Sequence, residues 1–224
     1  MKIFYDGNNP LLYNKVVQGF TSNASFAGKS EYTRYIDYIQ NYIQYTGNLP
    51  CSFQVTTEDE DDILRQARVI SSMSENIFIK IPIIKSNGSY NLNIIKYIIN
   101  NKIKVNITAL YTIEHIDALY EILNNNLQKT IVSVFAGSIM DAGLDPVPTI
   151  SHAVKIFSKL NNIEIIWAGC QTNFNIVQAK LAGSHIITVP DSIMIKMDRI
   201  NKDLNLLAMN RVDRFILDAK NLII

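Results

Sequence analysis

Eight short apolar segments recur along the chain, and each is separated from the next by turn residues and a helix-like pattern. They are the segments 2–5, 17–20, 51–55, 77–84, 105–109, 130–135, 163–167 and 185–189. Segments of this length that are rich in β-branched and aromatic residues predict buried strands. Regular alternation of strands and helices predicts a parallel sheet. Eight such units favour an α/β fold of the (β/α)8 barrel type.

Stretches with apolar residues at helical spacing lie between these segments. We expect a short helix from Pro10 to Val16, and further helices over 31–47, 58–73, 91–100, 112–126, 149–160, 173–182 and, as an amphipathic C-terminal segment, about 191–224. The acidic run 58–62 predicts a solvated helix start, where carboxylates suit the helix dipole. The Gly- and Pro-containing stretch 136–148 predicts a loop. Since no linker interrupts the pattern, we expect one domain over residues 1–224.

A doubly wound open sheet is the competing architecture. Such sheets usually have fewer strands and often carry a glycine-rich first turn that binds a dinucleotide. Here the first turn reads Asp6-Gly7-Asn8-Asn9-Pro10, which does not match that fingerprint. The barrel is therefore the preferred prediction.

Composition narrows the range of partners. The chain has 224 residues, of which 48% are hydrophobic and 18% charged, and its net charge is +1. These values are typical of a globular protein with a substantial core, and they give no reason to expect nucleic acid or a membrane surface as a partner. No apolar stretch reaches the roughly 20 residues of a membrane helix. The two cysteines lie far apart and the chain starts directly with a strand-like run, so we expect reduced thiols and a cytoplasmic protein.

One lysine stands inside the fourth segment, in the run Ile77-Phe78-Ile79-Lys80-Ile81-Pro82-Ile83-Ile84. Side chains alternate between the two faces of a strand, so Phe78, Lys80 and Pro82 share one face. Burial would disfavour the ammonium form and lower the pKa of Lys80. A neutral amine is the nucleophile that Schiff-base chemistry requires. The alternative is a lysine that extends to water or pairs with a carboxylate.

Small polar residues stand at or near the ends of six consecutive segments, where barrels of this type carry their active sites. These residues are Asp6, Thr21, Asn23, Ser52, Gln54, Lys80, Asn106, Thr108 and Ser133. Asp6 is the only carboxylate among them. A lysine nucleophile with one carboxylate to move protons is a minimal aldolase apparatus. Asp6 could instead serve only as a turn residue beside Gly7.

Other chemistries have little support in the sequence. The three histidines, at 115, 152 and 185, do not have the spacing of a metal site. Neither a nucleophile elbow nor a P-loop is present. We expect Cys170 to be a packing residue, and Trp167 to lie either at the mouth of the barrel or in its core.

Several motifs, in order along nearly the whole chain, resemble those of the transaldolase family, and most closely its small branch, which includes the fructose-6-phosphate aldolases. The motifs are Met1-Lys2-Ile3-Phe4-Tyr5-Asp6, Gly19-Phe20-Thr21-Ser22-Asn23-Ala24-Ser25, Ile79-Lys80-Ile81-Pro82, Val105-Asn106-Ile107-Thr108, Ser133-Val134-Phe135-Ala136-Gly137, Leu181-Ala182-Gly183 and Thr188-Val189-Pro190. The resemblance implies a class I, Schiff-base barrel enzyme that uses no metal and no organic cofactor. It also implies small sugars as substrates.

The resemblance further assigns roles to individual residues. It implies that Lys80 attacks the ketose carbonyl and that Asp6 takes the proton of the C4 hydroxyl. It implies that Thr108 and Gln54 together position a water that relays protons. Its implied substrate-binding set, together with the neighbouring strand-end residues, is Thr21, Asn23, Ser52, Asn106, Ser133, Phe135, Ser138 and Gln171.

Three departures from the family pattern bear on the reaction and its substrate. Gln54 is typical of the aldolase branch, where transaldolases usually have Glu, whereas Phe135 is typical of transaldolases, where aldolases have Tyr. The arginine that binds phosphate after the sixth strand falls on Ser138, and the Ser-x-Arg or Ser-x-Lys motif after the seventh falls on Gly169-Cys170-Gln171. Guanidinium groups bind phosphate through charge and bidentate geometry. Their loss predicts a non-standard or unphosphorylated sugar, held at its far end by Ser138, Gln171 and Asn173.

Transfer of a dihydroxyacetone unit from a ketose donor to an aldehyde acceptor is the preferred function. An aldolase that releases the three-carbon unit is the first alternative, and an inactive barrel with a binding role is the second. The resemblance also implies a homo-oligomer of the pentamer or decamer type, and the apolar chain end 215–224 is compatible with one.

Overall fold

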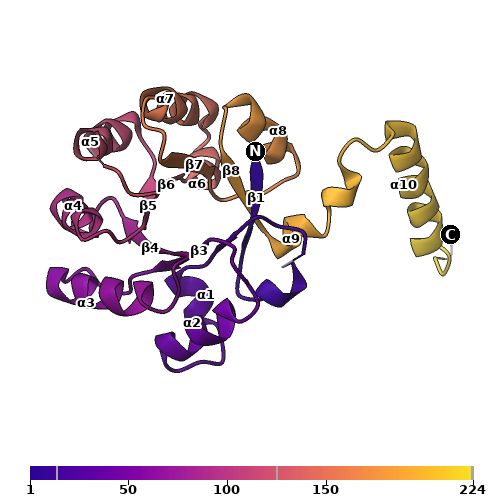
Figure 1. Cartoon of the computed structure of the whole chain (residues 1–224). Helices are drawn as coiled ribbons and strands as arrows, with labels where there is room; N and C mark the ends of the chain where they lie inside the picture. Colours follow the sequence, from indigo (N-terminus) through magenta and orange to yellow (C-terminus); the bar gives the residue numbers. More distant parts are fainter. Residues whose placement is uncertain (14, 125, 223–224) are drawn as a thin grey trace.

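In the computed structural model, which describes residues 1–13, 15–124 and 126–222, eight parallel strands close into a barrel in chain order (Figure 1). The strands are β1 Lys2–Asp6, β2 Phe20–Thr21, β3 Cys51–Gln54, β4 Ile77–Pro82, β5 Val105–Leu110, β6 Thr130–Val134, β7 Ile163–Trp167 and β8 Ile186–Pro190. Strand β1 pairs with both β2 and β8, which completes the ring. The predicted (β/α)8 barrel is confirmed.

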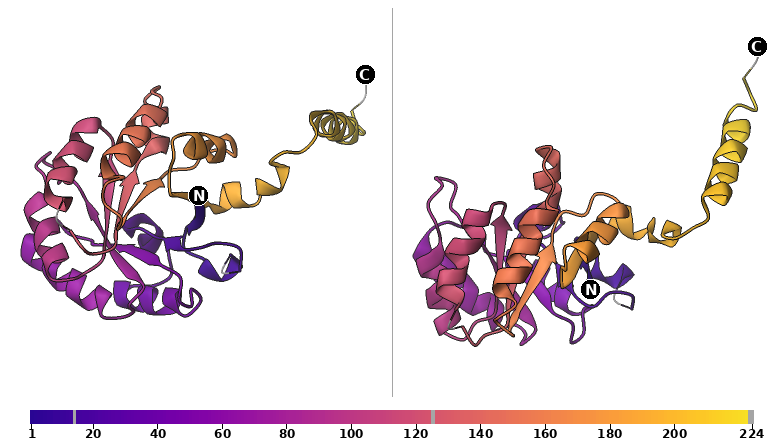
Figure 2. Two further views of the ribbon diagram at one scale, coloured as in Figure 1. Left: turned by 45° about the horizontal axis from the view of Figure 1, so that its top comes forward. Right: turned by 90° about the horizontal axis from the view of Figure 1, so that it is seen from above.

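Helices surround this barrel and follow most of the strands (Figures 1 and 2). They are α1 Ala24–Gly28, α2 Tyr35–Ile43, α3 Glu60–Ser71, α4 Leu92–Asn100, α5 Ile113–Leu123, α6 Ala136–Asp141, α7 Val147–Phe157, α8 Phe174–Leu181, α9 Asp191–Met194 and α10 Leu204–Asp218, with 3-10 helices η1 Pro10–Leu12 and η2 Met197–Arg199. None of the helices in the described ranges is long and apolar enough to cross a membrane.

The core has two parts, which lie on opposite sides of the strands. The larger part packs the outer faces of the strands against the helices. The smaller part is a cluster of side chains from β1, β4, β6, β7 and β8 and the first residue after β7, namely Phe4, Phe78, Ile131, Ile166, Ile186 and Ala168. Side chains from strands on different sides of a barrel meet only in its interior, so Phe78 points into the lumen. Lys80, two residues further along β4, shares that face, as the sequence predicts.

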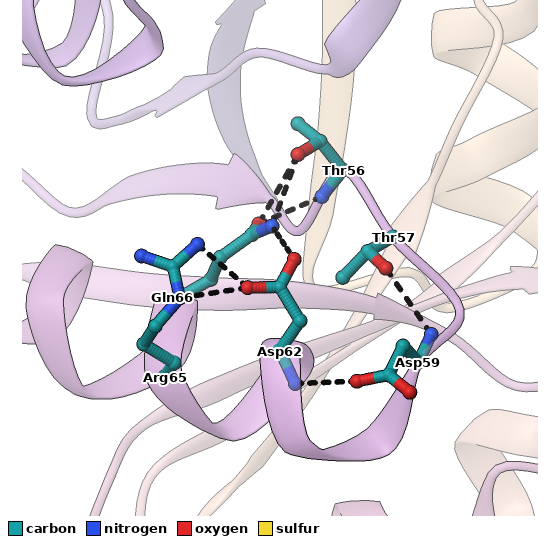
Figure 3. Close-up of polar contacts among 6 residues, drawn as sticks. All are labelled: Thr56, Thr57, Asp59, Asp62, Arg65 and Gln66. Carbon is teal, nitrogen blue, oxygen red and sulfur yellow. Dashed lines mark hydrogen bonds and ion pairs between the residues drawn. The ribbon is translucent and has the colours of Figure 1, made fainter.

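The acidic run at the start of α3 caps the helix (Figure 3). The Asp59 carboxylate accepts a hydrogen bond of 2.9 Å from the backbone N–H of Asp62, and Asp62 forms an ion pair with Arg65 at 2.6 Å. Gln66 joins this group to the preceding loop, because its side-chain oxygen accepts a 2.9 Å bond from the N–H of Thr56. A side-chain cap at this position satisfies an otherwise unpaired backbone donor. The predicted helix start is confirmed.

Several boundaries differ from the predictions. Strand β2 occupies residues 20–21 rather than 17–20, and the helix predicted from Pro10 shortens to η1. The stretch 136–148, predicted to be a loop, contains α6, and the short helix α1 was not predicted at all. Both missed helices have six residues or fewer and lie at strand exits, where length and periodicity are too short to signal a helix. The predicted helices 10–16 and 112–126 and the segment 191–224 each include residues outside the described ranges, namely 14, 125 and 223–224.

The C-terminal segment leaves the barrel after β8 and ends in α10, which stands apart from the other helices (Figures 1 and 2). None of the α10 residues is buried. Large apolar side chains are nevertheless exposed on α10 and just after it: Leu204, Leu206, Met209, Val212, Phe215, Ile216, Leu217 and Leu222. Breaks at 200–203 and 195–196 divide the predicted helical segment into α9, η2 and α10.

Candidate active site

A small polar cavity of about 150 Å³ opens at the carboxyl ends of the strands. Lys80 is the only cationic residue among the described residues that line this cavity, and it is 6% exposed. The other residues that line the cavity are Asp6, Thr21, Asn23, Ser133, Phe135, Ser138, Ala168, Gly169 and Thr188. The barrel thus brings seven of the twelve residues singled out from the sequence into one cavity.

Burial sets the protonation chemistry of Lys80 and Asp6. Loss of hydration lowers the pKa of Lys80, and the nearby Asp6 carboxylate opposes this shift. Burial likewise raises the pKa of Asp6, against the effects of Lys80 and of a hydrogen bond from Thr21. The direct ion pairs among the described residues all lie elsewhere. Lys80 and Asp6 therefore influence each other across the cavity, which leaves space between them for a reacting carbon chain.

A short chain of hydroxyl groups orients the Asp6 carboxylate. The Thr21 hydroxyl donates to Asp6 Oδ1 at 2.6 Å and lies 2.5 Å from the Thr188 hydroxyl. Because the single Thr21 proton points to the carboxylate, Thr188 is the donor in the second bond. Thr188, on β8, was not named as a site residue in the sequence prediction. Its signal was its place in the Thr188-Val189-Pro190 motif and its position two residues after the lumen residue Ile186.

Three buried polar residues form a second chain beside Lys80. The Asn106 side-chain amide donates to Ser52 Oγ at 2.9 Å, and Ser133 Oγ donates to Asn106 Oδ1 at 2.7 Å. Asn106 lies level with Lys80 in the pairing of β4 and β5. Of the three residues only Ser133 lines the cavity, and Ser52 and Asn106 lie behind it. Their mutual bonds fix the rotamers of groups that would otherwise be unsatisfied in the lumen.

The rim of the cavity comes from the loops after β2 and β6. The Asn23 side chain accepts a 3.0 Å bond from the N–H of Phe26 and thereby caps α1. Phe135 precedes α6, and the Lys80 ammonium lies 5.9 Å from the centroid of its ring. The Phe135 ring also contacts the ring of Tyr111, with the two centroids 5.5 Å apart. Phe135 thus forms an apolar wall next to the amine, which adds to its desolvation.

Gln54 and Thr108 lie near Lys80 but are not part of the cavity wall. Gln54 pairs with Lys80 in the register of β3 and β4. The Thr108 hydroxyl is buried and has no hydrogen-bond partner among the residues that the structure describes. The next residue, Ala109, has a φ of +60°, at an irregularity in the pairing of β5 and β6. Bulges of this kind redirect side chains and recur next to active sites, and strained backbone is concentrated there too.

At the far end of the cavity, the structure places Ser138 at the wall but keeps Gln171 away from it. Gln171 is exposed, and its amide donates to Asp141 Oδ1 at 2.9 Å and to the carbonyl of Gly137 at 3.3 Å. It therefore ties the loop after β7 to α6. The side-chain amide of Asn173 donates to the Lys196 carbonyl at 2.7 Å, also outside the cavity.

The close approach of two glycines sets the shape of this end. A Cβ atom on Gly137 would overlap the carbonyl oxygen of Gly169. Gly169 itself has a φ of +79°, which favours glycine. Trp167, just before this loop, is fully buried in the outer core. Of the two positions expected for this residue, the mouth of the barrel and the core, the structure therefore shows the core. Cys170 is buried as well, as expected for a packing residue.

In the parts of the chain that the structure describes, side chains of His, Cys, Asp and Glu do not gather in a group of three that could hold a metal ion. The groups that do converge are an amine, a carboxylate, hydroxyls and an amide. Together they can add an amine to a carbonyl, hold hydroxyl groups by hydrogen bonds and move a proton.

Fold and site together define a (β/α)8 barrel with a lysine-centred polar cavity at the carboxyl ends of its strands. The chain belongs to the transaldolase/fructose-6-phosphate aldolase family, whose model matches residues 9–222. It is 30% identical over 183 residues to a probable transaldolase of Thermoanaerobacter sp. (strain X514), an alignment that covers 81% of this chain and 80% of that protein. A probable transaldolase of Herpetosiphon aurantiacus is 28% identical over 180 residues, which cover 80% of this chain and 76% of that protein.

Solved structures with the same fold are more distant in sequence. A dihydrodipicolinate synthase from Rhodopseudomonas palustris superimposes with a TM-score of 0.60 at 12% identity, and the match covers 84% of this chain and 69% of that one. A mandelate oxidase variant superimposes with a TM-score of 0.58 at 10% identity, over 81% of this chain and 57% of that one. At such identities the likeness concerns the barrel fold alone.

Proposed function

We propose that the protein is a class I, Schiff-base enzyme in which Lys80 is the nucleophile and Asp6 moves protons. One observation carries the proposal: the only buried cation of the described lumen shares a small polar cavity with a carboxylate. Burial lowers the pKa of the amine, which favours the neutral nucleophile. Membership of the transaldolase/fructose-6-phosphate aldolase family supports the same chemistry.

The reaction balances without a cofactor. The neutral Lys80 amine adds to the ketone carbonyl of the donor, and the adduct takes up one proton and loses water, which leaves an iminium ion; the final hydrolysis returns that proton. Asp6 takes the proton of the C4 hydroxyl as the C3–C4 bond breaks, and the electron pair of that bond moves into the iminium to form an enamine. The aldehyde fragment leaves. The enamine then attacks the carbonyl carbon of an acceptor aldehyde, the new alkoxide takes a proton, and water hydrolyses the product from Lys80.

The surrounding polar residues hold the intermediate in this scheme. Asn23 and Ser133 bind the hydroxyl groups of the three-carbon unit from the cavity wall, and Asn106, for which the resemblance implies the same role, acts from behind the wall by orienting Ser133. The buried hydroxyl of Thr108, which has no partner in the described ranges, positions with Gln54 the water that relays protons. Thr21, Ser52 and Phe135 orient Asp6, Asn106 and the amine.

The preferred donor in this proposal is a ketose without a phosphate at its far end. Ser138 lines the cavity where the family pattern has an arginine, and Lys80 is the only cation among the described residues of the wall. A charge-assisted contact to a phosphate is worth roughly 1.5–3 kcal/mol, so its loss weakens a phosphorylated substrate by a factor of about ten or more per contact. Turnover of fructose 6-phosphate with erythrose 4-phosphate tests this. Efficient turnover at micromolar substrate would contradict it.

Transfer to an acceptor is the proposed reaction, and release of the three-carbon unit is the second candidate. Phe135 favours transfer, because a phenylalanine at this position cannot donate a proton to the enamine. Gln54, typical of the aldolase branch, favours release. Product formation with and without an acceptor aldehyde separates the two. If free dihydroxyacetone accumulates at the same rate in both mixtures, the enzyme is a lyase. An inactive barrel would form no adduct with any carbonyl donor.

We also propose a cytoplasmic homo-oligomer. The support for the oligomer is α10, whose apolar side chains are exposed and which has no buried residue. Val212 and Phe215 are 53% and 59% exposed, so they do not stabilise the barrel of their own chain. Light scattering should find an oligomer for the natural chain and a smaller species for a variant with Val212→Asp and Phe215→Asp. The same mass for both would contradict the proposal.

A further inference from the structure

A second, larger hollow lies next to the catalytic cavity. It is a groove of about 450 Å³ between the start of α5 and α6, three times the volume of the cavity itself by the same measure. Ser138 lines both the groove and the cavity. The ring contact of Tyr111 with Phe135 joins the two walls a second time, because Tyr111 lines the groove and Phe135 the cavity. Ser138 therefore borders both hollows, and a chain that leaves the cavity beside Ser138 would reach the groove.

The wall of the groove is mainly apolar. Tyr111, Ile113 and Leu144 supply exposed apolar surface, with 37%, 42% and 65% of each residue accessible. Ile139 of α6 and Ala142, directly after α6, also line the groove. A ligand with apolar carbon groups can cover these accessible side chains beside the catalytic cavity. The favourable binding free energy is then proportional to the apolar area removed from water.

The charges of the groove are negative. Glu114 and Asp145 line it, and no lysine or arginine does so among the residues that the structure describes. Hydrogen bonds from its own backbone N–H and from Thr112 hold the pKa of Glu114 below its ordinary value, so this carboxylate is ionised at neutral pH. At the N-terminus of α5, two backbone N–H groups already have side-chain acceptors: the Thr112 hydroxyl accepts the N–H of His115, and the Glu114 carboxylate accepts its own N–H. A phosphate would meet repulsion here.

We propose that this groove is the subsite for the far end of the acceptor aldehyde, and that it takes an uncharged group with apolar carbon atoms. The proposal rests on the Schiff-base function proposed above and specifies the substrate class of the same site. The reacting aldehyde carbon lies in the cavity between Lys80 and Asp6, and the chain passes Ser138. Its tail lies against Tyr111, Ile113 and Leu144.

Three acceptors with one donor test the proposal. Dihydroxyacetone-loaded enzyme is offered glyceraldehyde, glyceraldehyde 3-phosphate or phenylacetaldehyde, and kcat/KM is measured for each. We expect phenylacetaldehyde to exceed glyceraldehyde 3-phosphate by about tenfold or more, the usual reach of a few apolar contacts in a pocket. The opposite order, or equal values for all three acceptors, would overturn the assignment.

Substitutions locate the effect. In a variant with Ile113→Ser and Leu144→Ser, the phenylacetaldehyde-to-glyceraldehyde ratio of kcat/KM should fall about fivefold or more. Leu127→Ser is the matched control, since Leu127 is 91% exposed in the loop before β6, at the other end of the barrel. An unchanged ratio in the double variant would assign the preference to another surface. Glu114→Lys, at an exposed position, should raise the value for glyceraldehyde 3-phosphate about threefold or more, and no rise contradicts the charge argument.

Failure of the groove and failure of the chemistry give different results. Borohydride reduction in the presence of dihydroxyacetone reports the Schiff base without any acceptor. If Lys80 is trapped but the acceptor order is not as expected, the groove assignment alone falls. If Lys80 is not trapped, the proposed function falls and the groove assignment falls with it.

Discussion

Replacing Asp6 by asparagine separates the two halves of the proposed reaction. Asparagine has nearly the same shape as aspartate, and its amide oxygen can accept the 2.6 Å bond that Thr21 donates to Asp6 Oδ1. The substitution therefore keeps the packing and removes only the charge and the proton acceptor. Loss of a positioned general base usually costs about 10²–10⁴ in rate, or roughly 3–5 kcal/mol in the barrier. We expect Asp6→Asn to lower turnover by that factor.

Schiff-base formation should respond in the opposite sense. The Asp6 carboxylate favours the ammonium form of Lys80 and so counteracts the effect of burial, which lowers the pKa of the amine. Without the carboxylate only the effect of burial remains, and the pKa of Lys80 falls further. More of the amine is then neutral at a given pH below its pKa. The rate of borohydride trapping with dihydroxyacetone should therefore reach half of its maximum at a lower pH in the variant than in the natural enzyme.

The assay follows turnover and trapping for both proteins over a range of pH. Asp191→Asn is the matched control, because Asp191 also accepts a hydroxyl bond, of 2.8 Å from Tyr5, but lies outside the cavity. The control should keep turnover within about threefold. The reasoning is refuted if Asp6→Asn retains turnover within the same range, or if its trapping midpoint moves to higher pH.

Two further predictions concern structure near the site. Gly137→Ala places a methyl group against the Gly169 carbonyl and should cost roughly 1–3 kcal/mol of stability. Gly28→Ala has open space around its Cβ and should be neutral or stabilising. Calorimetric Tm values that rank the two variants in the other order would contradict this expectation. Burial raises the pKa of Cys51 to about 12 and that of Cys170 to about 11, so iodoacetamide should label both thiols slowly at neutral pH in the folded protein and quickly after unfolding. Fast labelling of the folded protein would show that one of them is accessible.

The lumen and its direction follow from local sequence rules. Strand periodicity is enough to place Phe78 and Lys80 on one face. The alternation of strands with helices predicts a parallel sheet, and the count of eight strands favours a closed barrel over an open sheet. Polar residues at strand ends converge because parallel strands end on the same side. These rules depend on neighbours along the chain, and so they can be read from the sequence.

The rest depends on contacts between distant segments. The bond between Thr21 and Thr188 joins strands at opposite ends of the chain, so nothing in either stretch indicates it. The turn of Gln171 towards Asp141 arises from the close approach of two loops, which two glycines permit. The short helices α1 and α6 have too few residues for their own apolar periodicity to indicate a helix. Sequence therefore predicts the chemistry of the site better than the geometry of its rim.

The most direct test of the account is to locate the covalent adduct. The protein is incubated with dihydroxyacetone and borohydride, digested and examined by mass spectrometry, alongside a Lys80→Met variant. The account predicts one reduced three-carbon adduct, on the peptide that contains Lys80, and no adduct in the variant. An adduct that persists in Lys80→Met, or an unmodified Lys80 in the natural protein, would contradict the central claim.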